Sequence, residues 1–265
     1  METKSRIASI LKASSLDFSI TGLPAFNLSA LNLLTDLDFQ LPTNLRLGHL
    51  VEKIVSELIK SATNYNVVYE NVQIIEAKRT IGEIDFIIEN IITKQVLHVE
   101  LVYKFYLFDP TISSQPINNW IGPNRNDSLR EKLEKLKTKQ LPLLYHNGAK
   151  SMFNKIEIGE TAQALCFLVS LFIPYRYKGH LSPIYEKAVK GYYINLETFI
   201  GFDHSEKSYY IPLKKEWGMN PAENEKWTDF SGVEKYIVTS IKEKKAPLCW
   251  QKHNDSYLAF FIVWW

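Results

Sequence analysis

Hydrophobic and polar residues alternate along two neighbouring segments of the chain, and this period of two predicts β-strands. In the second segment, one face carries only apolar and aromatic side chains, at Leu97, Val99, Leu101, Tyr103, Phe105 and Leu107. The first segment alternates in the same way over residues 84–89. We therefore expect an antiparallel hairpin over residues 82–107 that turns at residues 91–94.

The polar face of this hairpin holds the candidate chemistry. A pairing about residues 91–94 places Asp85 directly across from Glu100, and His98 and Lys104 share the face of Glu100. Cross-strand neighbours have Cβ atoms about 5 Å apart, where two like charges destabilise the pair. A divalent cation or a nearby lysine would compensate these charges. A solvent-exposed sheet face with ordinary ion pairs is the alternative interpretation.

Two amphipathic helices are predicted, one on either side of the hairpin. Residues 47–61 carry apolar side chains at intervals of three and four, with Glu52 beside the apolar stripe. Residues 127–140 form the second helix, whose leucine stripe is extended by Gln140. A buried amide without a partner costs roughly 1–3 kcal/mol, so we expect Gln140 to have one. The other faces of this helix are basic, which indicates either a solvated surface or phosphate contacts.

Two further strands complete a predicted α-β-β-β-α-β core. Residues 67–77 have the pattern of a strand, and residues 162–173 are a nearly continuous apolar run that suits a strand buried on both faces. We predict an α/β fold in which a mixed central sheet, flanked by helices, occupies residues 46–174. Residues 1–45 are predicted to form a helical N-terminal cover.

Residues 175–265 differ in character, because aromatic strand-like pieces alternate there with Lys- and Pro-containing connections. Strands are expected at residues 191–200, 208–213 and 257–265, and a helix near residues 232–242. This region is predicted to be an aromatic-rich α+β elaboration packed on the core. Its tryptophans would either belong to the core or form a platform on which bases stack.

The composition bounds the class of protein. The chain has 265 residues, of which 46% are hydrophobic, so it can bury a large core. Its formal net charge of +2 excludes a strongly basic field over the whole surface, so contacts with nucleic acid would need local patches. Cys166 and Cys249 are expected to be buried thiols in a reducing compartment. The apolar runs are too short for a signal peptide or a membrane span, and we expect a cytoplasmic protein.

The order of elements and the residues of the hairpin resemble a known superfamily. The letters GEID followed by an apolar strand and HVELVYK are similar to the GEID…VExK forms of the PD-(D/E)XK nuclease superfamily. More narrowly, ELVYKFYL followed by WIGPNRNDSLREKL resembles a family of uncharacterised bacterial proteins defined only as a domain of unknown function. The broad resemblance covers about residues 47–173 and implies a restriction-endonuclease-like core.

The superfamily resemblance implies roles for individual residues. Asp85 and Glu100 would hold a Mg²⁺ or Mn²⁺ ion. The implied catalytic residues are Glu52, Asp85, Glu100, Lys104 and Gln140. The residues implied to hold the nucleic-acid backbone are Arg125, Arg130 and Lys132. One position departs from the pattern, because three residues separate Glu100 from Lys104 where the superfamily has one. At about 3.3 Å per residue, Lys104 begins about 13 Å from Glu100 instead of about 7 Å.

Three functions from different classes are compatible with the sequence. The first is a metal-dependent nuclease that hydrolyses phosphodiester bonds, in DNA rather than RNA; a homodimer is compatible with it. The second is a non-catalytic nucleic-acid-binding or assembly module that keeps the fold, which a Lys104 ammonium paired away from both carboxylates would favour. The third is a carbohydrate- or small-molecule-binding protein, which a cleft exposing several tryptophans would favour.

Overall fold

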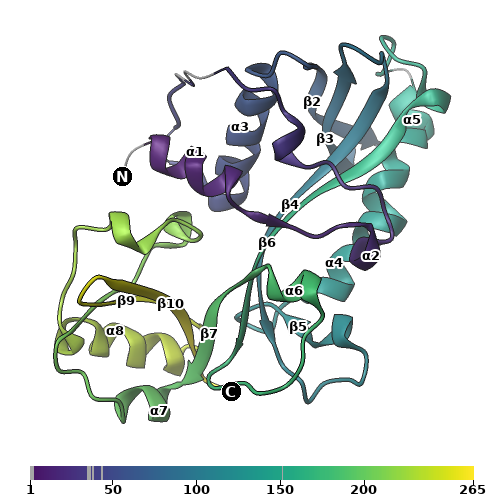
Figure 1. Ribbon diagram of the computed structural model, residues 1–265. Coiled ribbons are helices and arrows are strands. Elements are labelled where there is room, and N and C mark those ends of the chain that lie inside the picture. Colours follow the sequence, from purple (N-terminus) through teal and green to yellow (C-terminus); the bar gives the residue numbers. More distant parts are fainter. Residues whose placement is uncertain (1–2, 35–36, 38, 43, 151) are drawn as a thin grey trace. The chain divides into compact units, whose positions relative to one another are not determined.

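The computed structural model describes residues 3–34, 37, 39–42, 44–150 and 152–265. The chain has an α/β fold with a large mixed sheet flanked by helices (Figure 1). It divides into two compact units, each discontinuous along the sequence. Residues 15–103 and 131–168 form the first, here called the hairpin unit, and residues 1–14, 104–130 and 169–265 form the second, called the aromatic unit. The sequence divides the chain into three consecutive segments instead, and that division stays a prediction.

The hairpin unit is built on the strand order β2-β3-β4-β6. These strands are β2 (Tyr65–Glu76), β3 (Arg79–Asn90), β4 (Val96–Phe108) and β6 (Ala162–Pro174). The first three are antiparallel neighbours, and Phe86 of β3 pairs with Val99 of β4. The turn between β3 and β4 closes through the Lys94 amide, which donates to the Asn90 carbonyl at 2.9 Å. The hairpin, its register and the two outer strands are therefore confirmed.

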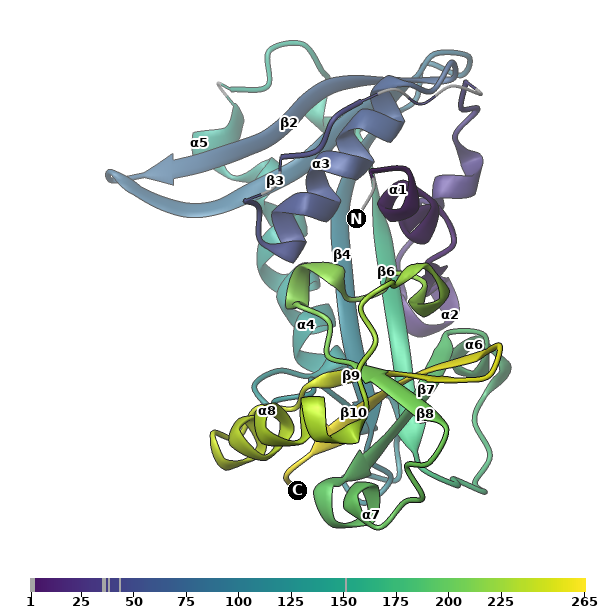
Figure 2. The same ribbon diagram turned by 90° about the vertical axis from the view of Figure 1, so that its left-hand side faces the viewer.

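The first predicted helix is α3 (Leu47–Lys60), which packs against β2 (Figure 2). Its apolar stripe is buried as the periodicity requires, with Val51, Ile54, Val55 and Leu58 fully inaccessible to solvent. This burial explains why a helix of only fourteen residues is stable here, since tertiary packing of an amphipathic face supplies most helical stability.

The second predicted helix changes type along its length. It begins as α4 (Leu129–Lys135), continues as a π turn, η3 (Leu136–Gln140), and ends in a 3₁₀ turn, η4 (Leu141–Tyr145). Pro142 lacks the N–H that another α-helical turn would need, which explains why the α-helix does not continue. The predicted stripe of Leu129, Leu133 and Leu136 is buried, which confirms the roll of the helix. π turns of this kind are frequent at functional sites.

One hydrophobic core cluster of the hairpin unit joins the two long strands β2 and β3 to the segment after the π turn. Ile74, Ile84 and Ile87 pack there with residues of η4 and of the short helix α5 (Asn147–Lys150). The remaining short elements of this unit are α2 (Phe18–Thr21), η1 (Leu28–Ala30) and η5 (Ile158–Glu160). The N-terminal cover over residues 1–45 stays a prediction, and residues 1–2, 35–36, 38 and 43 of it lie outside the described residues.

The aromatic unit continues from β6 in the strand order β6-β7-β10-β9-β8. The new strands are β7 (Val189–Asn195), β8 (Lys207–Tyr210), β9 (Leu248–His253) and β10 (Ser256–Val263). β7 is parallel to β6 and β10, whereas β8, β9 and β10 are antiparallel. The helices α7 (Leu196–Ile200) and α8 (Phe230–Lys242) pack on these strands. The smaller elements are α1 (Thr3–Leu11), β1 (Ser14–Ser15), η2 (Pro116–Asn119), β5 (Trp120–Ile121), α6 (Pro183–Glu186), η6 (Lys214–Glu216) and η7 (Pro221–Glu223).

Two expectations for this unit are corrected. Residues 196–200, expected to continue a strand, form α7, because the Asn195 side chain caps it by accepting from the Thr198 amide at 2.8 Å. Strand β9 had no counterpart in the prediction. The helix expected near residues 232–242 is confirmed as α8, whose first turn is capped by Asp229. Within the described residues, no helix is both long and apolar enough to cross a membrane.

Candidate functional site

Asp85 and Glu100 meet on the β3–β4 hairpin of the hairpin unit. The strand pairing runs as far as Phe86 and Val99, the residues next to Asp85 and Glu100, and the Leu101 amide donates to Asp85 Oδ2. The two acids are therefore neighbours on adjacent strands, as predicted. Asp85 is only 8% exposed and Glu100 is fully buried. His98, two residues before Glu100 on β4, is fully buried as well. These polar groups therefore do not belong to an ordinary solvent-exposed sheet face, and that alternative interpretation is excluded.

Burial and a neighbouring carboxylate together shift the pKa of Asp85 upward. Burial raises the pKa of Asp85 from its ordinary value of 3.8 to about 8, and the neighbouring Glu100 carboxylate acts in the same direction. Two groups oppose this shift: the Leu101 backbone amide, which donates to Asp85 Oδ2 at 2.8 Å, and the ammonium of Lys132. Asp85 therefore holds a proton at neutral pH unless a further cation is close.

Lys132 and Gln140 connect the helical segment to Glu100. Lys132 Nζ donates to Gln140 Oε1 at 2.9 Å, and Gln140 Nε2 donates to Glu100 Oε2 at 2.9 Å. The lysine sets the orientation of the amide, because an ammonium only donates and must face the amide oxygen. The partner expected for Gln140 is thus found. The superfamily resemblance implies that Lys132 contacts the nucleic-acid backbone, and its hydrogen bond to Gln140 was not predicted.

The π turn explains how two residues so far apart on one helical segment can meet. Lys132 lies on α4 and Gln140 at the end of η3, eight residues later. A π turn contains more residues per turn than an α-helix, so it changes which side chains share a face. The sequence pattern, interpreted as a regular α-helix throughout, places Gln140 on the leucine stripe and Lys132 on one of the other, basic faces.

The other oxygen of Glu100 contacts His98. His98 Nε2 lies 2.9 Å from Glu100 Oε1, and His98 Nδ1 lies 3.1 Å from Gln163 Nε2 on β6. Gln163 also donates to the Leu141 carbonyl at 2.7 Å. The sequence pattern places His98 on the face of Glu100, and its contact with Gln163 was not predicted. Gln163 was missed altogether, and no local pattern could have found it, because its role depends on β6 lying beside β4.

Glu52 reaches the same cluster from α3. Its carboxylate is one of the charges that raise the pKa of Asp85, after burial and Glu100. Its side chain is 26% exposed and pairs with His49 Nδ1 at 3.0 Å, one turn earlier on the helix. Glu52 is therefore a partly solvent-accessible acid whose charge acts on Asp85.

The other predicted site residues belong to the aromatic unit and have partners there. Lys104 Nζ pairs with Asp127 Oδ2 at 2.6 Å. Arg125 pairs with Asp109 Oδ2 at 3.2 Å, and its guanidinium lies over the Trp265 ring at 4.5 Å. Arg130 Nη1 is 3.5 Å from Asn118 Oδ1 and remains exposed. Lys104 is thus an ion-pair partner of Asp127.

Two acidic side chains with hard oxygen donors are the donor set that this site offers. Mg²⁺ is commonly held by one or two carboxylates, with waters completing its octahedron. Asp85 and Glu100 fit this requirement, and a cation would offset the repulsion that raises the pKa of Asp85. Across the described part of the chain, no group of three or more His, Cys, Asp and Glu side chains is placed to hold a metal. The residues present therefore suit a hydrated divalent ion that is bound by two carboxylates.

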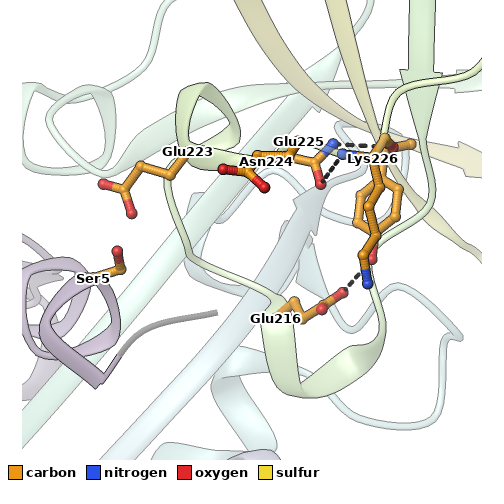
Figure 3. A pocket seen from close by; sticks show the side chains of 7 residues that line it. Ser5, Glu216, Glu223, Asn224, Glu225 and Lys226 are labelled. Carbon is orange, nitrogen blue, oxygen red and sulfur yellow. Dashed lines mark hydrogen bonds between the residues drawn. The ribbon is translucent and has the colours of Figure 1, made fainter.

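Neither of two pockets found in the structure is lined by Asp85 or Glu100. One, of about 510 Å³, lies in the aromatic unit and carries three glutamates (Figure 3). One of them, Glu216, already accepts hydrogen bonds from the Tyr210 hydroxyl and the Leu213 amide. The other pocket, of about 330 Å³, lies in the hairpin unit and is lined by Phe26, Tyr65 and Leu97, among others. None of the six tryptophans, all of them in described residues, is exposed, so the aromatic cleft that would favour a carbohydrate-binding protein is not formed.

The family of the chain is shown by a model that spans nearly all of it. The family described as "Domain of unknown function (DUF1853)" matches residues 14–257. The chain belongs to this family. The DUF1853 match includes every residue of the cluster, from Glu52 to Gln163, and supports the narrower of the two resemblances. No curated protein and no solved structure matches the chain.

Proposed function

We propose that this chain is a metal-dependent nuclease, which hydrolyses phosphodiester bonds of nucleic acid on a core like that of the PD-(D/E)XK superfamily. The observation that carries the proposal is the buried pair of carboxylates, Asp85 and Glu100, joined to a lysine through Gln140. Buried charges are expensive unless they are paired or bind a metal. A site built from two such acids is therefore a candidate for ion binding and not only for structure.

Asp85 and Glu100 would hold a Mg²⁺ or Mn²⁺ ion. Such an ion polarises a phosphoryl oxygen and lowers the pKa of a bound water. Gln140 and His98 each hold one oxygen of Glu100, so this carboxylate keeps a fixed orientation. Glu52, more exposed than the other two acids, would accept hydrogen bonds from water at the edge of the site.

We assign the lysine of the site to Lys132 in place of Lys104. The superfamily pattern places a lysine two residues after the second acid, but this chain has the buried Val102 there. Lys104 is engaged by Asp127, whereas the ammonium of Lys132 stabilises the ionised form of Asp85. A lysine on the neighbouring helix would then stabilise the charge that develops on the phosphate.

The basic residues of the second helical segment would contact the phosphate backbone. Arg130 is exposed, and Lys135 and Lys139 follow it on α4 and η3. Their contribution would be sequence-independent, because lysine and arginine contacts to phosphates carry no base information. DNA is the substrate class to test first, with RNA as the comparison.

A second candidate function is a non-catalytic nucleic-acid-binding or assembly module that keeps this fold. The ion pair between Lys104 and Asp127 favours it, since the lysine expected from the pattern is committed elsewhere. The two candidates differ in one respect that can be measured: the module would bind nucleic acid without cleaving it, whatever metal is supplied.

The test is a cleavage panel on purified protein. Single- and double-stranded DNA and RNA labelled with a fluorophore are incubated with Mg²⁺, Mn²⁺, Ca²⁺ or EDTA. The proposal expects cleavage with Mg²⁺ or Mn²⁺ and a loss of about 100-fold or more in Asp85→Asn and Glu100→Gln. Glu134→Gln, the same chemical change at an exposed position of α4, is the matched control and should cleave normally. Binding without cleavage under every metal would support the module instead.

A further inference from the structure

A second chain of hydrogen bonds reaches Glu100, and it is independent of Lys132 and Gln140. It starts at the Leu141 carbonyl, passes through the side chain of Gln163 and the ring of His98, and ends at Glu100 Oε1. Its three contacts measure 2.7, 3.1 and 2.9 Å. His98 and Glu100 are fully buried, so water does not compete for these bonds.

The donor and acceptor of every hydrogen bond in this series follow from the Leu141 carbonyl, with which the series begins. A carbonyl oxygen only accepts, so the Gln163 atom facing Leu141 has to be the amide nitrogen. The same nitrogen faces His98 Nδ1, which therefore accepts. With Nδ1 accepting, the imidazole carries its single proton on Nε2 and donates it to Glu100 Oε1. Gln163 thus selects one tautomer of His98, and that tautomer is the one that Glu100 requires.

We propose that His98 is a positioning residue of the metal site, held in its Nε2–H tautomer by Gln163, and that it fixes the plane of the Glu100 carboxylate. This inference rests on the proposed metal-dependent function. The terminal torsion of a glutamate is broad, so one hydrogen bond leaves the carboxylate free to swing. Donors on both oxygens, from His98 and Gln140, remove that freedom.

A purely structural role explains the arrangement less well. Packing alone does not require a histidine and a glutamine here, since two apolar side chains would fill the space without the cost of burying polar groups. The series of hydrogen bonds through Gln163 and His98 instead ends on Glu100, one of the two acids of the candidate site. Residues that donate hydrogen bonds to metal-bound carboxylates generally fix the orientation of those ligands. Their loss typically weakens metal affinity about 10- to 100-fold.

The test uses two substitutions that differ in where they place a donor. In His98→Gln the amide nitrogen lies roughly where Nε2 was and can still reach Glu100. In His98→Asn it lies roughly where Nδ1 was and cannot. His180→Asn, at an exposed position of the aromatic unit, is the control. Mn²⁺ binding is measured for each by electron paramagnetic resonance, and the tautomer of His98 in the wild type by ¹⁵N NMR of the ring.

We expect His98→Asn to weaken Mn²⁺ binding about 10- to 100-fold and His98→Gln to stay within about threefold of the wild type. Equal Mn²⁺ affinity in His98→Asn and the wild type would overturn the positioning role and leave the proposed function standing. A ring proton on Nδ1 in the wild-type spectrum would also overturn it, whether or not the variants fold. A wild-type protein that binds no Mn²⁺ would instead overturn the proposed function itself.

Discussion

Replacing Asp85 by asparagine should remove a pH dependence that this carboxyl group imposes on the stability of the metal-free protein. The pKa of Asp85 rises from 3.8 to about 8 on folding, chiefly because the group is buried and next because Glu100 is close. Between these two values the folded protein binds a proton that the unfolded chain does not. Stability therefore falls as the pH rises through this window, and the loss is complete above the folded pKa.

The magnitude follows from the two pKa values. Each pH unit in the window is worth about 1.36 kcal/mol, so moving from about pH 5.5 to about pH 9 should cost the wild type on the order of 3 kcal/mol. The asparagine in Asp85→Asn keeps the size of the side chain and the acceptor for the Leu101 amide, but it carries no charge at either pH. Relative to the wild type, the free energy of unfolding of the variant should therefore increase by on the order of 3 kcal/mol as the pH rises.

The assay is urea unfolding of both proteins in EDTA at several pH values, followed by circular dichroism. Taking the difference between the two proteins removes the contributions of those titrating groups that do not interact with Asp85. Asp255→Asn, in the exposed turn between β9 and β10, is the control and should follow the wild type at every pH. If the difference in free energy of unfolding between Asp85→Asn and the wild type does not change with pH, the electrostatic account of the site is refuted.

Three further predictions concern single residues. Lys132→Ala should lower turnover about 100-fold, whereas Lys135→Ala on the exposed side of the same helix should leave turnover unchanged; equal losses in an initial-rate assay would contradict the assignment of the lysine. Gln140→Leu removes a donor from buried Glu100 and should lower the free energy of unfolding by roughly 1–3 kcal/mol, which a urea titration near neutral pH would detect. Arg130→Ala should reduce the slope of log affinity against log salt by about 0.9 in a fluorescence anisotropy titration with DNA; an unchanged slope would make Arg130 an ordinary solvated charge.

The hairpin and its acids could be predicted from sequence because they depend on local patterns. A period of two sorts the side chains of β3 and β4 onto two faces, and a short turn leaves one register that buries the apolar residues. Once this register is set, Asp85 and Glu100 are expected to be neighbours, and the hydrogen bond from the Leu101 amide to Asp85 agrees with that. Burial of both acids was not predictable, since it depends on the segment from α4 to η4 that packs in the same unit.

The rest of the site depends on tertiary structure. Lys132 contacts Gln140 across a segment that changes to a π turn before Pro142, whereas the leucine pattern of this segment is that of a regular α-helix. Gln163 reaches His98 because β6 is the neighbour of β4, although more than sixty residues separate them in sequence. In the aromatic unit, residues 196–200 have the apolar content of a strand, and the capping side chain of Asn195 decides in favour of a helix.

The most direct measurement of the central claim is the thermal stability of wild type and Asp85→Asn with and without Mg²⁺ near pH 9, above the folded pKa of Asp85, where the ionised Asp85 carboxylate is repelled by Glu100. A cation at about 100 times its dissociation constant stabilises the folded state by about 2.7 kcal/mol, which corresponds to a rise of several degrees in Tm for a chain of this size. The account predicts this rise for the wild type and for Glu134→Gln, and none for Asp85→Asn. If saturating Mg²⁺ and Mn²⁺ leave the wild-type Tm unchanged, Asp85 and Glu100 do not hold a divalent cation, and the proposed nuclease is contradicted.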